Sequence, residues 1–279
     1  MTAVSLAPLS RRTGAGASLD RILAVAGRHA LVLQRSPHRL FDVVLWPVVD
    51  TVMFGSIGVY ASGAAHTPGS QVAVFLMVGI VLWHVVYQAQ IALATGLLEE
   101  TWSRNVLNLL ATPLHEWEYV AGVALFGLVK LVLGVGAVVV LAAGAYSFNI
   151  TTLGRGLVPI VAILLVVGWL VALFVIGLVL RYGSGAEALA WGILFVVMPL
   201  SGVFYPVSAL PAVLRPISEA LPTTHAFAAG RALATGHPMP WGELWLAAGT
   251  TVVLTAIALA YLTWMLRIFR RRGFVTRYS

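Results

Sequence analysis

The 279-residue chain contains no cysteine and only one lysine. Without cysteine there is no disulfide framework, no thiol nucleophile and no thiolate metal site. Charged residues make up only 10% of the chain, whereas a soluble domain of this length carries roughly a quarter. The apolar share is 60% and the mean hydropathy is +0.94. So much apolar surface does not fit inside one water-soluble core, and we therefore expect an integral membrane protein.

The chain also lacks the common catalytic motifs. The single lysine, Lys130, is not preceded by the glycine pattern of a phosphate loop, G-x-x-x-x-G-K-[ST]. The H-E-x-x-H and G-x-S-x-G motifs are absent, and no two of the seven histidines have the i, i+4 spacing of helical metal ligands. We predict no catalytic residue, no metal site and no cofactor in this chain. A membrane-embedded enzyme is an alternative class, but it needs a convergent polar site that the sequence does not show.

Six apolar stretches are long enough to cross a bilayer as helices, which takes about 20 residues each. They cover roughly residues 40–61, 72–97, 119–146, 157–180, 186–205 and 244–266. The prediction is an all-α membrane protein with a cytoplasmic arm, residues 1–39, and a six-span domain, residues 40–279.

The arginines indicate the orientation of these spans. Thirteen of the sixteen lie in the arm, after the second span, after the fourth span or in the tail 267–279, and the other three are Arg155, Arg215 and Arg231. The positive-inside rule then places both termini in the cytoplasm, and an even number of spans agrees. The net charge of +7 is explained by topology and by anionic lipid headgroups, so we expect lipid contact and no nucleic-acid partner.

Two segments outside the spans also have membrane character. Residues 20–35 alternate apolar and basic positions, which predicts an amphipathic helix on the cytoplasmic membrane surface; an ordinary solvated helix is the alternative. Residues 208–241 are moderately apolar but are interrupted repeatedly by proline. They predict a re-entrant hairpin of two short helices, about 211–220 and 223–234, between the fifth and sixth spans.

Three passages resemble the permease subunit of type-2 ABC exporters. Residues 98–113 end in a Leu-Leu-x-x-Pro turn and lead into the sequence EWEYVAG at 116–122. Residues 201–211, SGVFYPVSALP, are similar to the signature S-G-x-x-[FY]-P-x-x-x-[LM]-P and are the most specific of the three. Residues 221–226, LPTTHA, with RAL at 231–233, resemble the L-P-x-[ST] turn and downstream arginine of the family. The resemblance extends from about residue 21 to the tail.

This resemblance implies the multi-pass membrane subunit of an ATP-driven exporter in the bacterial inner membrane. It implies a permease dimer, a homodimer in the simplest case, working with two copies of a soluble ATPase that binds ATP and Mg. The expected cargo is hydrophobic or amphiphilic, such as a drug or a lipid-like molecule, and the alternative cargo is a polysaccharide or lipid-linked glycan. An ion-coupled secondary transporter is an alternative of a different class; it would need inverted repeats, which the two halves do not show convincingly.

In the family, the loop after the second span forms a coupling helix that docks on the ATPase. The resemblance assigns the coupling loop to residues 98–118, with the docking residues Glu99, Glu100, Trp102, Arg104, Val106 and Leu109. Glu100 and Arg104 have i, i+4 spacing, which favours a short helix. The alternative is a solvated loop without a partner.

The resemblance also places parts of the first, second and fifth spans at the dimer interface, lining the substrate pathway. The candidate pathway residues are Trp46, Asp50, Phe54, Trp83, Tyr87, Gln88, Phe195, Met198, Phe204 and Tyr205. Lipid contact and helix packing are the alternative roles for the aromatic residues. For Asp50 the alternative is a buried ion pair with Lys130, which lies at a matching depth.

Arg215, Glu219, Arg231 and Glu243 lie in or beside the outer hairpin, and an external gate is one interpretation of these charged residues; His225 also lies in the hairpin, and its role is left open. A simple i, i+4 ion pair between Arg215 and Glu219 is the other.

Overall fold

The computed structural model describes residues 14–64, 71–102, 112, 114–182 and 188–272, and every regular element in these ranges is helical. The long helices are α1 (Ala15–Gln34), α2 (Pro37–Ala64), α3 (Gln71–Trp102), α5 (Glu116–Tyr146), α6 (Leu157–Tyr182) and α10 (Trp241–Arg272). The shorter elements are η1 (Ile150–Gly156), α7 (Ala188–Leu200), η3 (Val207–Ala209), α8 (Arg215–Glu219) and α9 (Pro222–Ala234).

Five of the described helical segments are long and apolar enough to cross a membrane: α2, α3, α5, α6 together with η1, and α10. The fifth expected span, residues 186–205, is not one continuous helix. Its described helix, α7, has 13 residues and ends at Leu200. Gly202 follows with φ +66°, a left-handed conformation that a helix cannot contain and that glycine adopts without strain. The six-span count is therefore not confirmed; the described residues hold five spanning-length helices and one shorter apolar helix.

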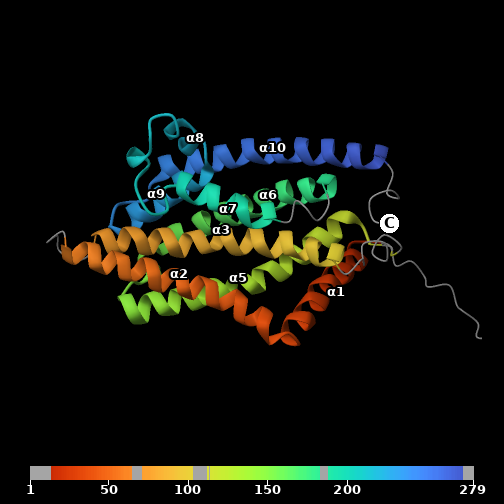
Figure 1. Ribbon diagram of the computed structural model, residues 1–279, viewed down its shortest axis with the longest axis horizontal. Coiled ribbons are helices and arrows are strands. Elements are labelled where there is room, and N and C mark those ends of the chain that lie inside the picture. Colours follow the sequence, from red (N-terminus) through yellow and green to blue (C-terminus); the bar gives the residue numbers. More distant parts are fainter. Residues whose placement is uncertain (1–13, 65–70, 103–111, 113, 183–187, 273–279) are drawn as a thin grey trace, which may run out of the picture.

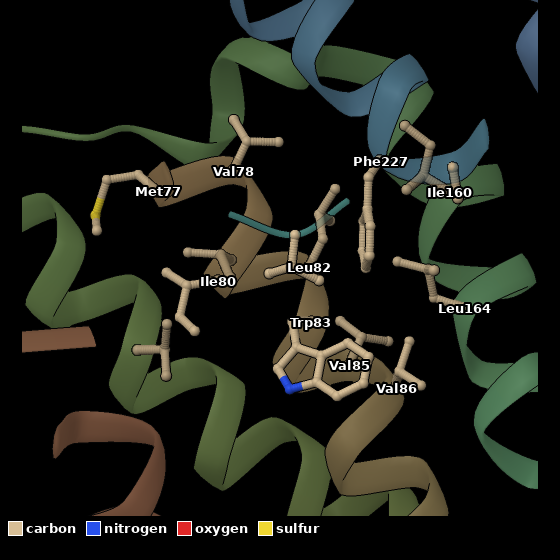
Figure 2. Close-up of a cluster of buried hydrophobic side chains, with 14 of the residues drawn as sticks. Met77, Val78, Ile80, Leu82, Trp83, Val85, Val86, Ile160, Leu164 and Phe227 are labelled. Carbon is tan, nitrogen blue, oxygen red and sulfur yellow. The ribbon is translucent and has the colours of Figure 1, made fainter. Parts of the chain in front are cut away.

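Helix α3 is the centre of the bundle. It packs against α2, α5, α6, α7 and α9, and most of its apolar side chains are buried. Figure 2 shows Leu82 and Trp83 of α3 in a cluster that also takes in Phe227 from α9 and Ile160 from α6. The apolar faces of α2 and α10 are largely exposed, which is the pattern expected when lipid is the solvent.

The two ends of the bundle differ in charge. Figure 1 shows α1 and the C-terminal end of α10 at one end, and α8 and α9 at the other. The arginines of α1, the start of α2 and the last turns of α6 and α10 belong to the first end, whereas Arg155, Arg215 and Arg231 lie in η1, α8 and α9. The described arginines are thus divided between the two ends as the charge pattern predicts.

The proline-rich segment between α7 and α10 contains the two expected short helices, α8 and α9, although α8 has only five residues. Helix α9 begins with Pro222 at its first position, where the missing N–H costs nothing. It packs against α3, α6 and α10 and buries Phe227 completely. This buried helix anchors the segment to the bundle.

Candidate functional site

Three arginine–glutamate ion pairs join α1 and the start of α2 to the ends of α3 and α5. The distances are 2.7 Å between Arg21 Nη2 and Glu118 Oε1 and 2.7 Å between Arg39 Nη1 and Glu99 Oε1. Arg28 forms the third pair, with Glu100. We call these residues the arginine latch: Arg21, Arg28, Arg39, Glu99, Glu100 and Glu118.

Glu118 is the most deeply bound acid of the latch. Its buried carboxylate accepts hydrogen bonds from Ser18 Oγ at 2.6 Å, Arg21 Nε at 2.8 Å and the His115 backbone N–H at 3.0 Å. The bond to His115 belongs to a capping box that starts α5. The hydrogen bond to Glu118 also raises the pKa of Arg21. Glu118 thereby begins α5 and holds α1 against it.

Apolar contacts lie beneath these ion pairs. The imidazole of His29 stacks on Phe126, with ring centroids 5.6 Å apart, and meets Tyr119 edge-on at 6.5 Å. Burial, followed by the charge of Arg28, lowers the pKa of His29 to about 4, so His29 is neutral at pH 7. Gly122 of α5 lies directly against α1; a Cβ there would come within 2.6 Å of the Val25 Cβ.

The structure changes the setting of the expected docking residues. Helix α3 continues past the predicted end at residue 97 to Trp102, so Glu99 and Glu100 lie on its last turns rather than in a loop. The Glu100 side chain is only 3% exposed, and both acids face arginines of this same chain. The predicted residues Arg104, Val106 and Leu109 lie outside the described residues, as do the Trp102 side chain and the Glu100–Arg104 pair.

Midway along α2, Asp50 faces α3. Its Oδ2 lies 3.7 Å from Nε2 of His84, whose ring meets Tyr87 edge-on at 5.8 Å. Lys130 instead lies over the ring of Phe126, 5.3 Å from its centroid. The alternative of an Asp50–Lys130 ion pair is therefore not realised in the described part of the chain.

Gln88, a predicted pathway residue, has a structural partner. Pro47 interrupts the middle of α2 and has no N–H to donate to the carbonyl of Val43, four residues earlier. The side-chain Nε2 of Gln88 donates to that carbonyl at 2.9 Å. Gly134 of α5 provides the space, since a Cβ there would lie 2.1 Å from the same nitrogen. Gln88 thus supplies the hydrogen bond to Val43 that Pro47 cannot donate.

The aromatic pathway candidates fall into different environments. Phe54 and Phe204 stack with their centroids 4.0 Å apart, and Trp83 is buried in the core. Trp46 and Phe195 are 55% and 76% exposed. Two further candidates, Met198 and Tyr205, are half-buried. The structure therefore brings Phe54 and Phe204 together and leaves Trp46 and Phe195 on the surface of a single chain.

The signature passage at 201–211 closes the end of α7. Ser201 Oγ and Thr223 Oγ1 share a hydrogen bond of 2.6 Å. Arg231 Nη2 donates to the carbonyls of Gly202 and Val203 at 2.7 and 2.8 Å, and the guanidinium lies 3.5 Å from the ring centroid of Phe75. Burial lowers the pKa of Arg231 to about 9. Arg231 therefore donates to buried backbone carbonyls at the break after α7.

The other candidate residues of the outer segment form local contacts. Arg215 donates to the carbonyls of Leu210 and Ser208, at 2.9 and 2.7 Å, and among the described residues it forms no ion pair with Glu219. His225 Nδ1 lies 2.8 Å from Glu243 Oε2, and its Nε2 lies 2.9 Å from the Glu219 carbonyl oxygen. The i, i+4 pair expected from the spacing is replaced by these contacts because Arg215 reaches the unpaired carbonyls of the preceding turn.

Several important residues were not among the predicted site residues: Arg21, Arg28, Arg39, His29, His84 and Glu118. Arg21, Arg28 and Arg35 are spaced by seven, which places them along one helix face. That spacing was a readable signal that α1 presents arginines in one direction. No pattern in the sequence identifies Glu118 as the partner of a residue 97 positions away.

The chain was also compared with known proteins. A family model described as ABC-2 type transporter matches residues 22–234. The match begins in α1 and ends with α9, so it includes most of the latch, the signature passage and Arg231. No curated protein matches the chain.

Proposed function

We propose that this chain, which belongs to the ABC-2 type transporter family, is the membrane subunit of an exporter driven by a separate ATPase. Two copies of the chain would work with two copies of the ATPase, which supplies ATP and Mg. The cargo would be hydrophobic or amphiphilic. The observation that carries the proposal is the arginine latch, which ties four helices, α1, α2, α3 and α5, together at the arginine-rich end.

In the sequence, latch residues lie on both sides of the segment proposed to dock the ATPase. Helix α3 ends at Trp102 and α5 begins at Glu116, and the latch residues Glu99, Glu100 and Glu118 lie at these two ends. A displacement of the intervening segment is therefore passed directly to α1 and α2. We assign direct ATPase contact to Trp102, Arg104, Val106 and Leu109, and we assign Glu99 and Glu100 to holding the base of that segment.

An open groove at the same end offers a second contact for the ATPase. It is lined mainly by apolar atoms, and its wall includes Leu19 and Ile22 of α1 and Trp117 of α5. Trp117 is 59% exposed, and exposed aromatic residues beside charged ones are typical anchors of protein interfaces. The groove and the latch share Arg21 and Glu118, so a partner bound there would act on the ion pairs.

The topology of the proposed exporter follows from the arginines and from α7. The arginine-rich end would face the bacterial cytoplasm. In this proposal α7 and the turn after it form the fifth of six crossings, with α8 and α9 as a re-entrant hairpin on the outer side. The exposed faces of α2 and α7, which carry Trp46 and Phe195, would meet a second copy along the transport pathway.

The test of the latch is a charge exchange between Arg28 and Glu100. We expect Arg28→Glu alone and Glu100→Arg alone to lower substrate-stimulated ATP hydrolysis about tenfold, because each leaves like charges facing one another. The double exchange restores opposite charges and is expected to recover at least half of the activity. The measurement is ATP hydrolysis and co-purification of the permease–ATPase complex in nanodiscs.

Arg35→Glu is the matched control, because it changes the net charge equally at an exposed position, the C-cap of α1. Recovery in the double exchange supports positioning by the latch, whereas no recovery would show that Glu100 contacts the ATPase itself. A wild-type chain that co-purifies with no ATPase would contradict the proposed function.

A further inference from the structure

Asp50 is a carboxylate in the middle of a membrane-spanning helix. It lies midway along the 28-residue α2, and its side chain is 34% exposed. The neighbouring exposed side chains on α2 are apolar or aromatic, including Trp46, Val49 and Met53. A charge at this depth is costly and marks a functional site unless it is paired.

In the described part of the chain, no basic side chain reaches hydrogen-bond distance of this carboxylate. Within the described part of the chain, His84 is the basic group that lies within ion-pair distance of Asp50. The 3.7 Å between Oδ2 and Nε2 is longer than a hydrogen bond. Lys130, the other charge inside the spans, contacts Phe126 instead.

His84 is itself a polar group without a partner. Its side chain is 1% exposed, and among the residues that the structure describes neither Nδ1 nor Nε2 has a hydrogen-bond partner. Buried polar atoms in native structures are nearly always satisfied, so an unsatisfied imidazole facing a carboxylate requires an explanation. A cation bound between Asp50 and solvent would supply the compensating charge that this carboxylate lacks.

Aromatic rings lie one helical turn to either side of Asp50. Trp46 precedes it by four residues and Phe54 follows it by four, so all three share one face of α2. Trp46 is 55% exposed, and the ring of Phe54 is held in place by its stack on Phe204. A carboxylate between two aromatic rings is the arrangement that recognises organic cations, because the ring faces attract positive charge.

We propose that Asp50, with His84 behind it and Trp46 and Phe54 on either side, forms a binding site for a lipophilic monovalent organic cation. Asp50 supplies the compensating charge, and the two rings supply apolar and cation–π contact. This inference rests on the proposed function in naming the class of cargo, although binding can be measured without the ATPase.

The test is equilibrium binding of tetraphenylphosphonium to the full-length chain in nanodiscs of phosphatidylcholine, with empty nanodiscs as background. We expect Asp50→Asn to weaken binding at least tenfold and Trp46→Leu to weaken it about threefold. Asp42→Asn is the matched control, because Asp42 is an exposed acid on the same helix eight residues earlier, and its affinity should stay within twofold of wild type. Tetraphenylborate, which has the same shape and the opposite charge, should bind weakly and should not respond to Asp50→Asn.

Asp50→Glu keeps the charge and separates binding from folding. Retained binding in Asp50→Glu together with loss in Asp50→Asn supports the site. Equal binding by Asp50→Asn and wild type, equal loss in Asp42→Asn, or equal binding of both probes would overturn it. If Asp50→Asn does not fold, unchanged affinity in Trp46→Leu overturns the proposal and a threefold loss supports it.

Failure of this site and failure of the proposed function give different results. If the chain binds tetraphenylphosphonium through Asp50 but assembles with no ATPase, the cation site is supported and the exporter proposal is contradicted. If ATP hydrolysis depends on the latch but the chain binds the cation without Asp50, the exporter proposal is supported and the cation site is contradicted.

Discussion

Gln88 shows how one side chain takes over a backbone function. Its amide donates to the Val43 carbonyl that Pro47 leaves without an N–H. The sequence makes Gln88 a candidate for the substrate pathway, because a polar residue inside a span has few other roles. The proline in the neighbouring span was visible, but the pairing depends on the relative rotation of α2 and α3, which periodicity does not determine.

We predict that Gln88→Leu destabilises the protein only when Pro47 is present. In the wild-type background the substitution leaves the half-buried Val43 carbonyl without its donor, at a cost of about 1 kcal/mol. In a Pro47→Ala background the main-chain N–H at position 47 can donate to Val43, so Gln88→Leu should cost much less. Thermal unfolding of the four purified proteins in detergent measures both costs, and equal costs in the two backgrounds would contradict this role for Gln88.

At His29 we predict acid-sensitive attachment of α1. Burial lowers the folded-state pKa to about 4, below the ordinary value near 6.5. The detached helix therefore binds a proton more readily, so the contribution of His29 is complete above about pH 6.5 and falls as the pH drops toward 4. At pH 5.5 the loss is about 1 kcal/mol.

The measurement is protease sensitivity of α1 between pH 7.5 and 5 with an acid-tolerant protease. His29→Phe keeps the ring stack on Phe126 without a titratable group, and its cleavage should depend less on pH than that of the wild type. The same pH dependence in both proteins would assign the effect to another group.

The packing of α1 on α5 depends on a close approach at Gly122. A Cβ there would come within 2.6 Å of Val25 and 2.8 Å of the Ile22 carbonyl oxygen, and both belong to α1. We predict that Gly122→Ala displaces α1 from α5. Because the chain has no cysteine, a single Val25→Cys reporter, half-buried in the wild type, should react with a maleimide several-fold faster in the Gly122→Ala protein.

Gly136→Ala on the same helix is the control, since a Cβ at that position meets no atom within 4 Å. If the Val25→Cys reporter reacts at the same rate alone, with Gly122→Ala and with Gly136→Ala, then α1 is not held by this contact.

Two element boundaries differ from the sequence prediction, for opposite reasons. Hydropathy ends the second span at residue 97 because two acids follow, but α3 continues because the latch arginines neutralise Glu99 and Glu100. Hydropathy extends the fifth span to Tyr205 because the residues stay apolar, but α7 ends before Gly202. A hydropathy window sums the transfer free energies of neighbouring side chains. It therefore contains no information about an ion-pair partner far away in the sequence or about a change in backbone direction.

At the scale of the molecule, composition and charge are sufficient to predict an integral membrane protein. Apolar surplus predicted lipid as the solvent, and the described arginines separate to the two ends of the bundle as expected. The resemblance at 201–211 led to the family that the comparison confirms. What could not be predicted is the set of long-range polar contacts, such as Arg21 with Glu118 and Asp50 with His84, because these depend on how the helices are packed.

The remaining prediction concerns the number of crossings. Helix α9 packs against η1 and α3, so the chain after α7 lies at the end opposite the arginine-rich one, although α7 has only 13 described residues.

If α7 crosses the membrane, His38 and Ala209, both exposed, lie on opposite sides. In this cysteine-free chain, a membrane-impermeant maleimide applied to spheroplasts should label Ala209→Cys, and it should label His38→Cys only after permeabilisation. Detergent-denatured samples, in which both thiols react, control for reactivity. Labelling of both positions from the same side would mean that α7 turns back within the membrane, which would leave five crossings and place the two chain ends on opposite sides.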